Sequence, residues 1–183
     1  MSLVVIDEDS YQVIIELAYA TAQNIAGRPV YTQAQCALHR DAAVALKRAS
    51  EYAQMAGFTL KIFDAYRPQA AQDVFWSVLD DPRYVSDPSL GSNHTRGIAV
   101  DLTLVDHTGQ SLDMGTGFDD MHDASHHLYP HHPPQVQQNR FLLLGVMQKA
   151  GFKPLATEWW HYELPDRHRY PLIPSHPLVT VAS

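Results

Sequence analysis

Two short segments of the chain contain residue types that can bind a metal ion. In the first, His94 and Asp101 stand seven residues apart, and in the second Glu158 precedes His161 by three residues. A catalytic zinc site typically has three protein ligands and an open fourth position, and zinc accepts imidazole and carboxylate ligands. Zinc also lowers the pKa of a bound water to about 7, and a neighbouring carboxylate can accept the proton. His94, Asp101 and His161 are therefore candidate ligands, and Glu158 is a candidate general base.

The same four residues also have a structural interpretation. A histidine or an aspartate in a strand is more often a surface or core polar group, and the spacing does not match the helical H-E-x-x-H zinc motif. Glu158 and His161 would face opposite sides of a regular strand, because successive side chains alternate. Either Glu158 lies in the loop before the strand or a bulge re-aims it. We expect the loop.

Arg67 is a further candidate, in the segment 64–68 (D-A-Y-R-P). We expect it at the junction of a strand with a helix, where a guanidinium can stabilise an oxyanion or bind a carboxylate. The structural alternative is an ion pair with Asp64.

Two polar segments follow in the second half of the chain. Residues 113–123 carry four aspartates, which can bind a substrate ammonium group or form a solvated loop. Residues 122–132 carry five histidines that look like a second metal cluster. The prolines between them argue against an ordered helix that would align the imidazoles, so we do not expect a second metal site.

Hydrophobic periodicity predicts the elements that must position these residues. Helices are expected over 41–55, 68–79 and 139–151. Strands are expected over 58–64, 98–105 and 158–164, the second of them half-buried with Asp101 on its more polar face. Loops are expected over 80–92 and 113–134, and the proline-rich tail offers little regular structure. Helices and short strands are mixed without βαβ regularity, which favours an α+β fold in one domain spanning 1–183.

The composition excludes several classes of protein. The 183 residues are 45% hydrophobic and 18% charged, which is typical of a globular domain and excludes intrinsic disorder. A net charge of −7 disfavours a nucleic-acid or anionic-membrane surface. The single cysteine, Cys36, excludes a disulfide within the chain and a cysteine-based zinc site.

No segment has the composition of a membrane span or a leader. The longest apolar run, 141–147, has seven residues, whereas a membrane span needs about 20. The apolar start runs directly into Asp7, Glu8 and Asp9 without the basic residues of a secretory signal. We therefore expect a cytoplasmic protein, although a secreted protein without its leader would show the same features.

Five segments together resemble one known family, the VanX-type D-alanyl-D-alanine dipeptidases. Residues 92–104 (S-N-H-T-R-G-I-A-V-D-L-T-L) resemble the family's zinc motif S-x-H-[ST]-R-G-x-A-[IV]-D-L-T-L. Residues 158–162 (E-W-W-H-Y) and 64–68 resemble its E-W-W-H-[YF] and D-x-Y-R-P motifs. Residues 19–24 (Y-A-T-A-Q-N) and 114–119 (M-G-T-G-F-D) match two further elements. The resemblance implies an α+β domain with a central, mainly antiparallel sheet, shared with zinc D,D-peptidases and the hedgehog domain.

The resemblance also implies a catalytic centre. It implies one zinc ion per chain held by His94, Asp101 and His161, with Glu158 as general base and acid. It implies that Arg67 stabilises the tetrahedral intermediate.

Substrate contacts are implied in the same way. Asp119 and Tyr19 would hold the amino end of a small dipeptide, and Ser92 would contact the same substrate. Asn93 and Asp120 are departures from the residues that some relatives carry. The oligomeric state is left open.

Three functions are compatible with this resemblance. The first is hydrolysis of the dipeptide D-Ala-D-Ala to two D-alanines. A D,D-carboxypeptidase acting on peptidoglycan stem peptides would use the same zinc residues and differ only in substrate length. A non-catalytic zinc-stabilised binding module is the third, and the presence of both Glu158 and Arg67 argues against it.

Overall fold

The computed structural model describes residues 3–79, 81 and 89–181. Its longer helices are α2 (Arg40–Met55), α3 (Gln69–Val78) and α4 (Pro134–Ala150), and α1 (Glu8–Tyr11) is a single turn. The 3-10 turns are η1 (Ala18–Ala20), η2 (Asp123–Ser125) and η3 (Arg167–Arg169). The strands are β1 (Leu3–Val5), β2 (Ile14–Ile15), β3 (Tyr31–Ala34), β4 (Ala37–His39), β5 (Thr59–Asp64), β6 (Ala99–Val105), β7 (Lys153–Leu155), β8 (Glu158–Glu163) and β9 (Val179–Val181).

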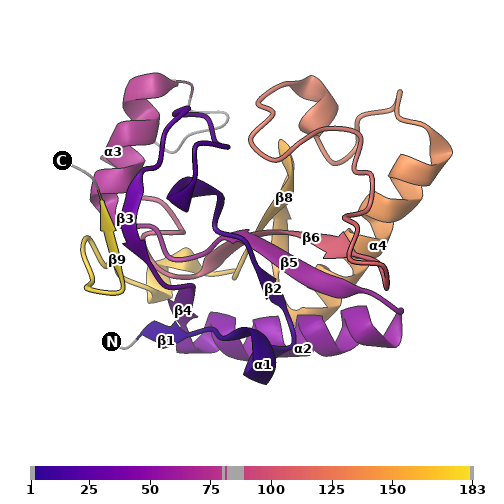
Figure 1. The fold of residues 1–183 in the computed structure, drawn as a ribbon, viewed down its shortest axis with the longest axis horizontal. Helices are drawn as coiled ribbons and strands as arrows, with labels where there is room; N and C mark the ends of the chain where they lie inside the picture. The colour runs from indigo at the N-terminus through magenta and orange to yellow at the C-terminus, as the bar shows by residue number, and fades with distance from the viewer. Residues whose placement is uncertain (1–2, 80, 82–88, 182–183) are drawn as a thin grey trace.

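Five of the strands form the central sheet, in the order β2-β5-β6-β8-β7. The β2–β5 pair is parallel, and the other three pairs are antiparallel. Two small antiparallel sheets, β1–β4 and β3–β9, lie beside it (Figure 1). The predicted α+β fold with a mainly antiparallel sheet is confirmed.

The helix α2 covers one face of this sheet together with α4 (Figure 1). Its small apolar residues recur at helical spacing, and Ala42, Leu46, Ala49 and Ala53 are fully buried against the sheet. The side chain of His39 caps the start of the helix by accepting a hydrogen bond from the Asp41 amide. This helix supports β5 and β6, which carry Asp64 and Asp101.

The strand β6 differs from the prediction in its burial. All seven of its residues are buried, so the expectation of a half-buried strand is wrong. β6 lies between β5 and β8, and Val100, Leu102 and Leu104 pack into the helix-covered core. The opposite face carries Asp101 and Thr103 and is covered by other parts of the chain rather than by water.

The helix α4 begins five residues before the predicted start. Pro133 is its N-cap and Pro134 its first residue, a position where the missing amide hydrogen of proline costs nothing. Gly151 ends the helix in a left-handed conformation, with φ of 107°. Pro133 and Pro134, at the end of the predicted loop 113–134, therefore mark the beginning of a helix.

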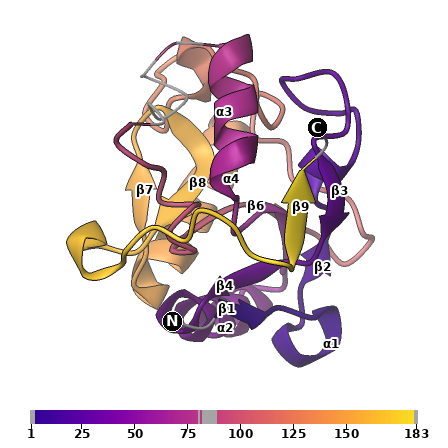
Figure 2. The same cartoon turned by 90° about the vertical axis from the view of Figure 1, so that its left-hand side faces the viewer.

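The C-terminal segment is irregular, as predicted, but it is firmly attached to the rest of the molecule. The Leu164 amide donates to Ile98 O at 3.0 Å, and the Ile173 amide donates to Thr95 O at 2.9 Å. Figure 2 shows this segment, in yellow, running from β8 across the molecule to β9, which pairs with β3. The segment thus crosses the loop that contains His94.

Two sequence expectations concern other parts of the chain. The predicted loop 80–92 falls largely on residues 80 and 82–88, which lie outside the described residues. Across the described ranges, every helix is too short or too polar to cross a bilayer.

Candidate active site

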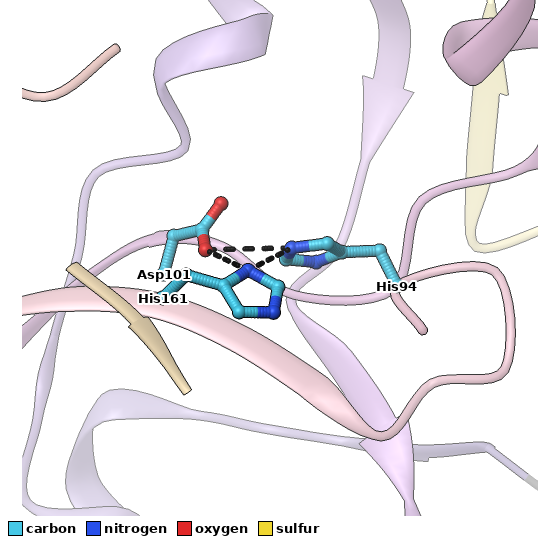
Figure 3. A group of neighbouring side chains, drawn as sticks. All are labelled: His94, Asp101 and His161. Carbon is cyan, nitrogen blue, oxygen red and sulfur yellow. Dashed lines mark hydrogen bonds and ion pairs between the residues drawn. The ribbon is translucent and has the colours of Figure 1, made fainter. Parts of the chain in front are cut away.

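Three side chains from separate segments meet near the start of β6 (Figure 3). His94 comes from the loop before β6, Asp101 from β6 and His161 from β8, where the register places it opposite Asp101. His94 Nε2 lies 3.2 Å from His161 Nδ1. Asp101 Oδ1 lies 3.0 Å from His161 Nδ1 and 3.4 Å from His94 Nε2. All three residues are buried.

The other nitrogen of each imidazole has its own hydrogen-bond partner. His94 Nδ1 lies 2.7 Å from Ala65 O, and His161 Nε2 lies 3.1 Å from Glu163 Oε2. A carbonyl and a carboxylate accept hydrogen bonds, so both contacts favour a proton on these outer nitrogens. When the imidazoles are neutral, the lone pairs of His94 Nε2 and His161 Nδ1 then face Asp101, where a metal ion would use them.

This geometry suits a divalent metal ion with nitrogen and oxygen ligands. Three donors bound at about 2.0–2.1 Å in tetrahedral geometry lie about 3.3 Å from one another. The three distances between donors here, 3.0, 3.2 and 3.4 Å, match that spacing. Within the part of the chain that the structure describes, these residues form the one group of three or more potential ligands close enough to share an ion. Among the described residues, the histidines of 122–132 form no second group of this kind.

When no metal ion is bound, Asp101 and the imidazole of His161 shift each other's pKa values. Burial alone would lower the pKa of His161, but its hydrogen bonds to Asp101 and Glu163 raise it to about 10. The imidazoles beside Asp101 hold the pKa of that carboxyl well below its usual range, against the opposing effect of burial. A proton on His161 therefore provides the positive charge that a metal ion would otherwise supply.

Glu158 is the first residue of β8, so the expectation that it lies in the loop before the strand is wrong. The register between β7 and β8 shifts, pairing Leu155 with Glu158 and Pro154 with Tyr162. This irregularity frees Glu158 from the alternation of a regular strand, and both Glu158 and His161 line one cavity. Glu158 Oε1 has no hydrogen-bond partner among the described residues, and burial raises the pKa of its carboxyl to about 8.

Arg67 lies at the junction of β5 with α3, as predicted. It also forms the ion pair with Asp64 that was expected if its role were structural. Its Nε donates to Asp64 Oδ2 at 2.9 Å, and Nη1 donates to Gln72 Oε1 at 3.1 Å. Its Nη2 lies 3.5 Å from Asp101 Oδ2, and the guanidinium packs 4.9 Å from the ring centre of Tyr19. The buried charge is thereby fixed beside the three candidate ligands.

The three predicted substrate residues lie around the same cavity. Tyr19 Oη donates to Asp119 Oδ1 at 3.1 Å, and the Ile25 amide lies 3.4 Å from Asp119 Oδ2. Asp119 has a positive φ of 62°, a conformation that aspartate tolerates better than most residues. Burial raises the pKa of its carboxyl to about 7, and the positive charge of Arg67 opposes this shift. Ser92 is buried, and its Oγ accepts a hydrogen bond from the His94 amide.

The cavity that joins these residues encloses about 220 Å³. This is less than the roughly 300–1,000 Å³ of pockets for drug-sized ligands, so the cavity fits a small substrate. The eight candidate residues that line it are Tyr19, Arg67, Ser92, His94, Asp101, Asp119, Glu158 and His161. The structure therefore brings together every site residue that the sequence predicted.

Two features of the candidate site escaped the sequence analysis. Glu163 holds His161, and its carboxylate also accepts from Asn93 Nδ2 at 2.5 Å and pairs with Lys153 Nζ at 2.7 Å. The sequence could have indicated Glu163, because residues two apart in a strand share a face and Glu163 follows His161 by two. Arg167, from the proline-rich tail, also lines the cavity, and no sequence pattern marks it.

Comparisons with known proteins agree with the resemblance seen in the motifs. The family model described as D-ala-D-ala dipeptidase (Peptidase_M15) matches residues 1–179. A D-alanyl-D-alanine dipeptidase of Escherichia coli is 52% identical over 159 residues, covering 87% of this chain and 82% of that protein. A D-alanyl-D-alanine dipeptidase of Enterococcus faecalis is 32% identical, covering 88% and 90%. The solved L-Ala D-Glu endopeptidase ChiX of Serratia marcescens aligns with a TM-score of 0.44 at 14% identity, over 92% of this chain and all of that one.

Proposed function

This chain belongs to the D-Ala-D-Ala dipeptidase family of peptidases, and on that premise we propose that it is a zinc-dependent enzyme that hydrolyses D-Ala-D-Ala to two D-alanines. The observation that carries the proposal is the buried group of His94, Asp101 and His161 beside Glu158, whose Oε1 has no partner among the described residues, in a small cavity. We assign the activity to one domain spanning residues 1–183 with one zinc ion.

The three ligands proposed for Zn²⁺ are His94 Nε2, Asp101 Oδ1 and His161 Nδ1. Bound zinc supplies Lewis acidity, which polarises the peptide carbonyl and makes an attacking water more acidic. Glu158 accepts the proton of that water and returns it to the leaving amine. Burial suits this role, because a carboxyl whose pKa is raised holds the transferred proton more readily than an exposed one.

Arg67 stabilises the negative charge that develops on the former carbonyl oxygen. Its guanidinium is held by Asp64, Gln72 and Tyr19, so it does not have to reorganise when the charge appears. A preorganised donor of this kind typically contributes a few kcal/mol to transition-state stabilisation.

Asp119 binds the substrate ammonium group, and this contact selects a dipeptide. A longer peptide carries an amide at that position, which cannot neutralise the buried carboxylate of Asp119. Tyr19 orients the carboxylate through its hydrogen bond. The small volume of the cavity adds a steric limit on the length of the substrate.

We expect Asp119→Asn to raise KM for the dipeptide about tenfold with a smaller change in kcat. An ammonium group binds the ionised carboxylate, and the pKa of Asp119 is raised to about 7 by burial. Protonation of Asp119 as the pH falls below about 7 should therefore raise KM in the wild type, and the variant should lose this dependence. Initial rates between pH 5.5 and 8.5 test this, with the exposed Asp123→Asn as control. An unchanged KM would remove Asp119 from substrate recognition.

Release of free D-alanine is the direct test of the proposed function. Zinc-loaded protein is incubated with D-Ala-D-Ala and with a pentapeptide ending in D-Ala-D-Ala, each with and without chelator. We expect chelator-sensitive release from the dipeptide alone. Release from the pentapeptide would instead indicate a carboxypeptidase, and no release from either would indicate a binding module.

A further inference from the structure

The cavity lining is rich in acidic groups and has two arginines. Besides Asp101, the carboxylates of Asp119, Glu158 and Glu163 line it, and the arginines are Arg67 and Arg167. A zwitterionic dipeptide brings its own carboxylate into these surroundings. That carboxylate needs a cationic partner, because like charges in a partly buried site repel strongly.

Arg67 already has several partners and a proposed role. Its guanidinium contacts Asp64, Gln72, Tyr19 and Asp101 and is buried. Its charge is assigned above to the oxyanion of the reacting carbonyl, so the substrate carboxylate needs a second cation.

Arg167 is in the opposite situation. It belongs to η3, and it is exposed while still lining the cavity. Its guanidinium makes no hydrogen bond or ion pair with any residue that the structure describes. Its positive charge repels that of Arg96, and burial together with this repulsion lowers the pKa of Arg96. The side chain therefore offers free donors beside other positive charge.

The backbone around Arg167 is fixed at both ends. Before it, the Leu164 amide donates to Ile98 O at 3.0 Å. After it, Arg96 Nη1 donates to Tyr170 O at 2.6 Å, and the Ile173 amide donates to Thr95 O. All three anchoring partners, residues 95, 96 and 98, lie in the segment 92–98, which also contains His94. Arg167 is thus held at a set position relative to the candidate ligands rather than on a free tail.

We propose that Arg167 is a specificity-determining residue that binds the free carboxylate of the substrate. This inference rests on the proposed function, because it assumes a substrate with a terminal carboxylate. A guanidinium matches a carboxylate with two parallel N–H donors, which gives orientation as well as affinity. With Asp119 at the ammonium group, the two residues select a substrate with both ends free.

The test compares D-Ala-D-Ala with its C-terminal amide, which has the same shape without the negative charge. Binding is measured by calorimetry to zinc-loaded Glu158→Gln protein, so that turnover does not interfere. The comparison proteins carry Arg167→Gln or Arg169→Gln in addition. Arg169 is a matched control, because it lies in the same turn, packs 5.9 Å from the ring centre of Tyr170 and is absent from the cavity lining.

We expect Glu158→Gln protein to bind the acid about tenfold more tightly than the amide. Arg167→Gln should remove this preference, Arg169→Gln should keep it, and Arg167→Lys should restore part of it. An unchanged preference after Arg167→Gln, equal weakening of both ligands or binding of neither ligand would overturn the inference. Failure of the proposed function is seen separately, as absence of D-alanine release by the wild type.

Discussion

The Glu158→Gln protein is expected to retain stoichiometric zinc and to lose about a hundredfold to ten-thousandfold in kcat toward D-Ala-D-Ala. Glutamine has the shape of glutamate but cannot accept a proton from water at neutral pH. Glu158 lies beside the candidate ligands without belonging to the group that can share the ion, so its replacement should leave the metal affinity nearly unchanged. Metal analysis and initial-rate kinetics on the same preparation measure both quantities.

The matched control is Glu51→Gln, which makes the same chemical change on the exposed side of α2. Its rate should equal that of the wild type. Two results would contradict the assignment of Glu158 as the base. One is a rate near that of the wild type, and the other is loss of zinc, which would show that the carboxylate holds the metal instead.

The central elements could be predicted because each is a continuous segment with a recognisable local pattern of apolar residues. The helix α2 repeats small apolar residues along one face, and the strands β5, β6 and β8 are short runs bounded by turn residues or charges. The prediction of the candidate site depended on the types and spacing of its residues rather than on a predicted fold. His94 and Asp101 bracket the start of one strand, and His161 lies in its partner, so antiparallel pairing of β6 with β8 brings them together.

Pairings between distant short strands could not be predicted. β3 and β9 have four and three residues, too few for a period, and they lie almost at opposite ends of the chain. The displacement of Glu158 into the site results from an irregular register between β7 and β8, which depends on the partner strand as much as on the sequence of β8. The position of Arg167 depends on backbone hydrogen bonds to residues 95 and 98, and no side-chain pattern encodes those.

His161→Ala is expected to abolish stoichiometric zinc binding. The change leaves two of the three donors, and it also leaves Asp101 and Glu163 without the imidazole that lies between them. The exposed His168→Ala is the control for the loss of an imidazole, and it should bind one zinc ion per chain. Metal analysis after dialysis distinguishes the two, and tight binding by the His161 variant would refute its role as a ligand.

The same assignment predicts how zinc affinity depends on pH. In the metal-free protein, hydrogen bonds to Asp101 and Glu163 outweigh burial and raise the pKa of His161 to about 10. Zinc must displace that proton, so the affinity of the wild type should rise as the pH rises from 6 to 9. Competition titrations with a chelator of known affinity measure this slope, and a flat profile would contradict the protonated state of His161.

Replacing Glu163, the hydrogen-bond partner of His161, should reduce zinc affinity by a smaller amount than replacing His161 itself. The carboxylate of Glu163 accepts the hydrogen bond of His161 Nε2 and is itself held by Asn93 and Lys153. Replacing such a partner of a metal ligand typically lowers metal affinity about 10- to 100-fold, so Glu163→Gln should weaken zinc binding without abolishing it. Lys153→Met removes only the half-exposed end of this network and should have a smaller effect. If both variants bound zinc like the wild type, His161 would be oriented by the strand alone, and the carboxylate would be a structural acceptor rather than a positioning residue.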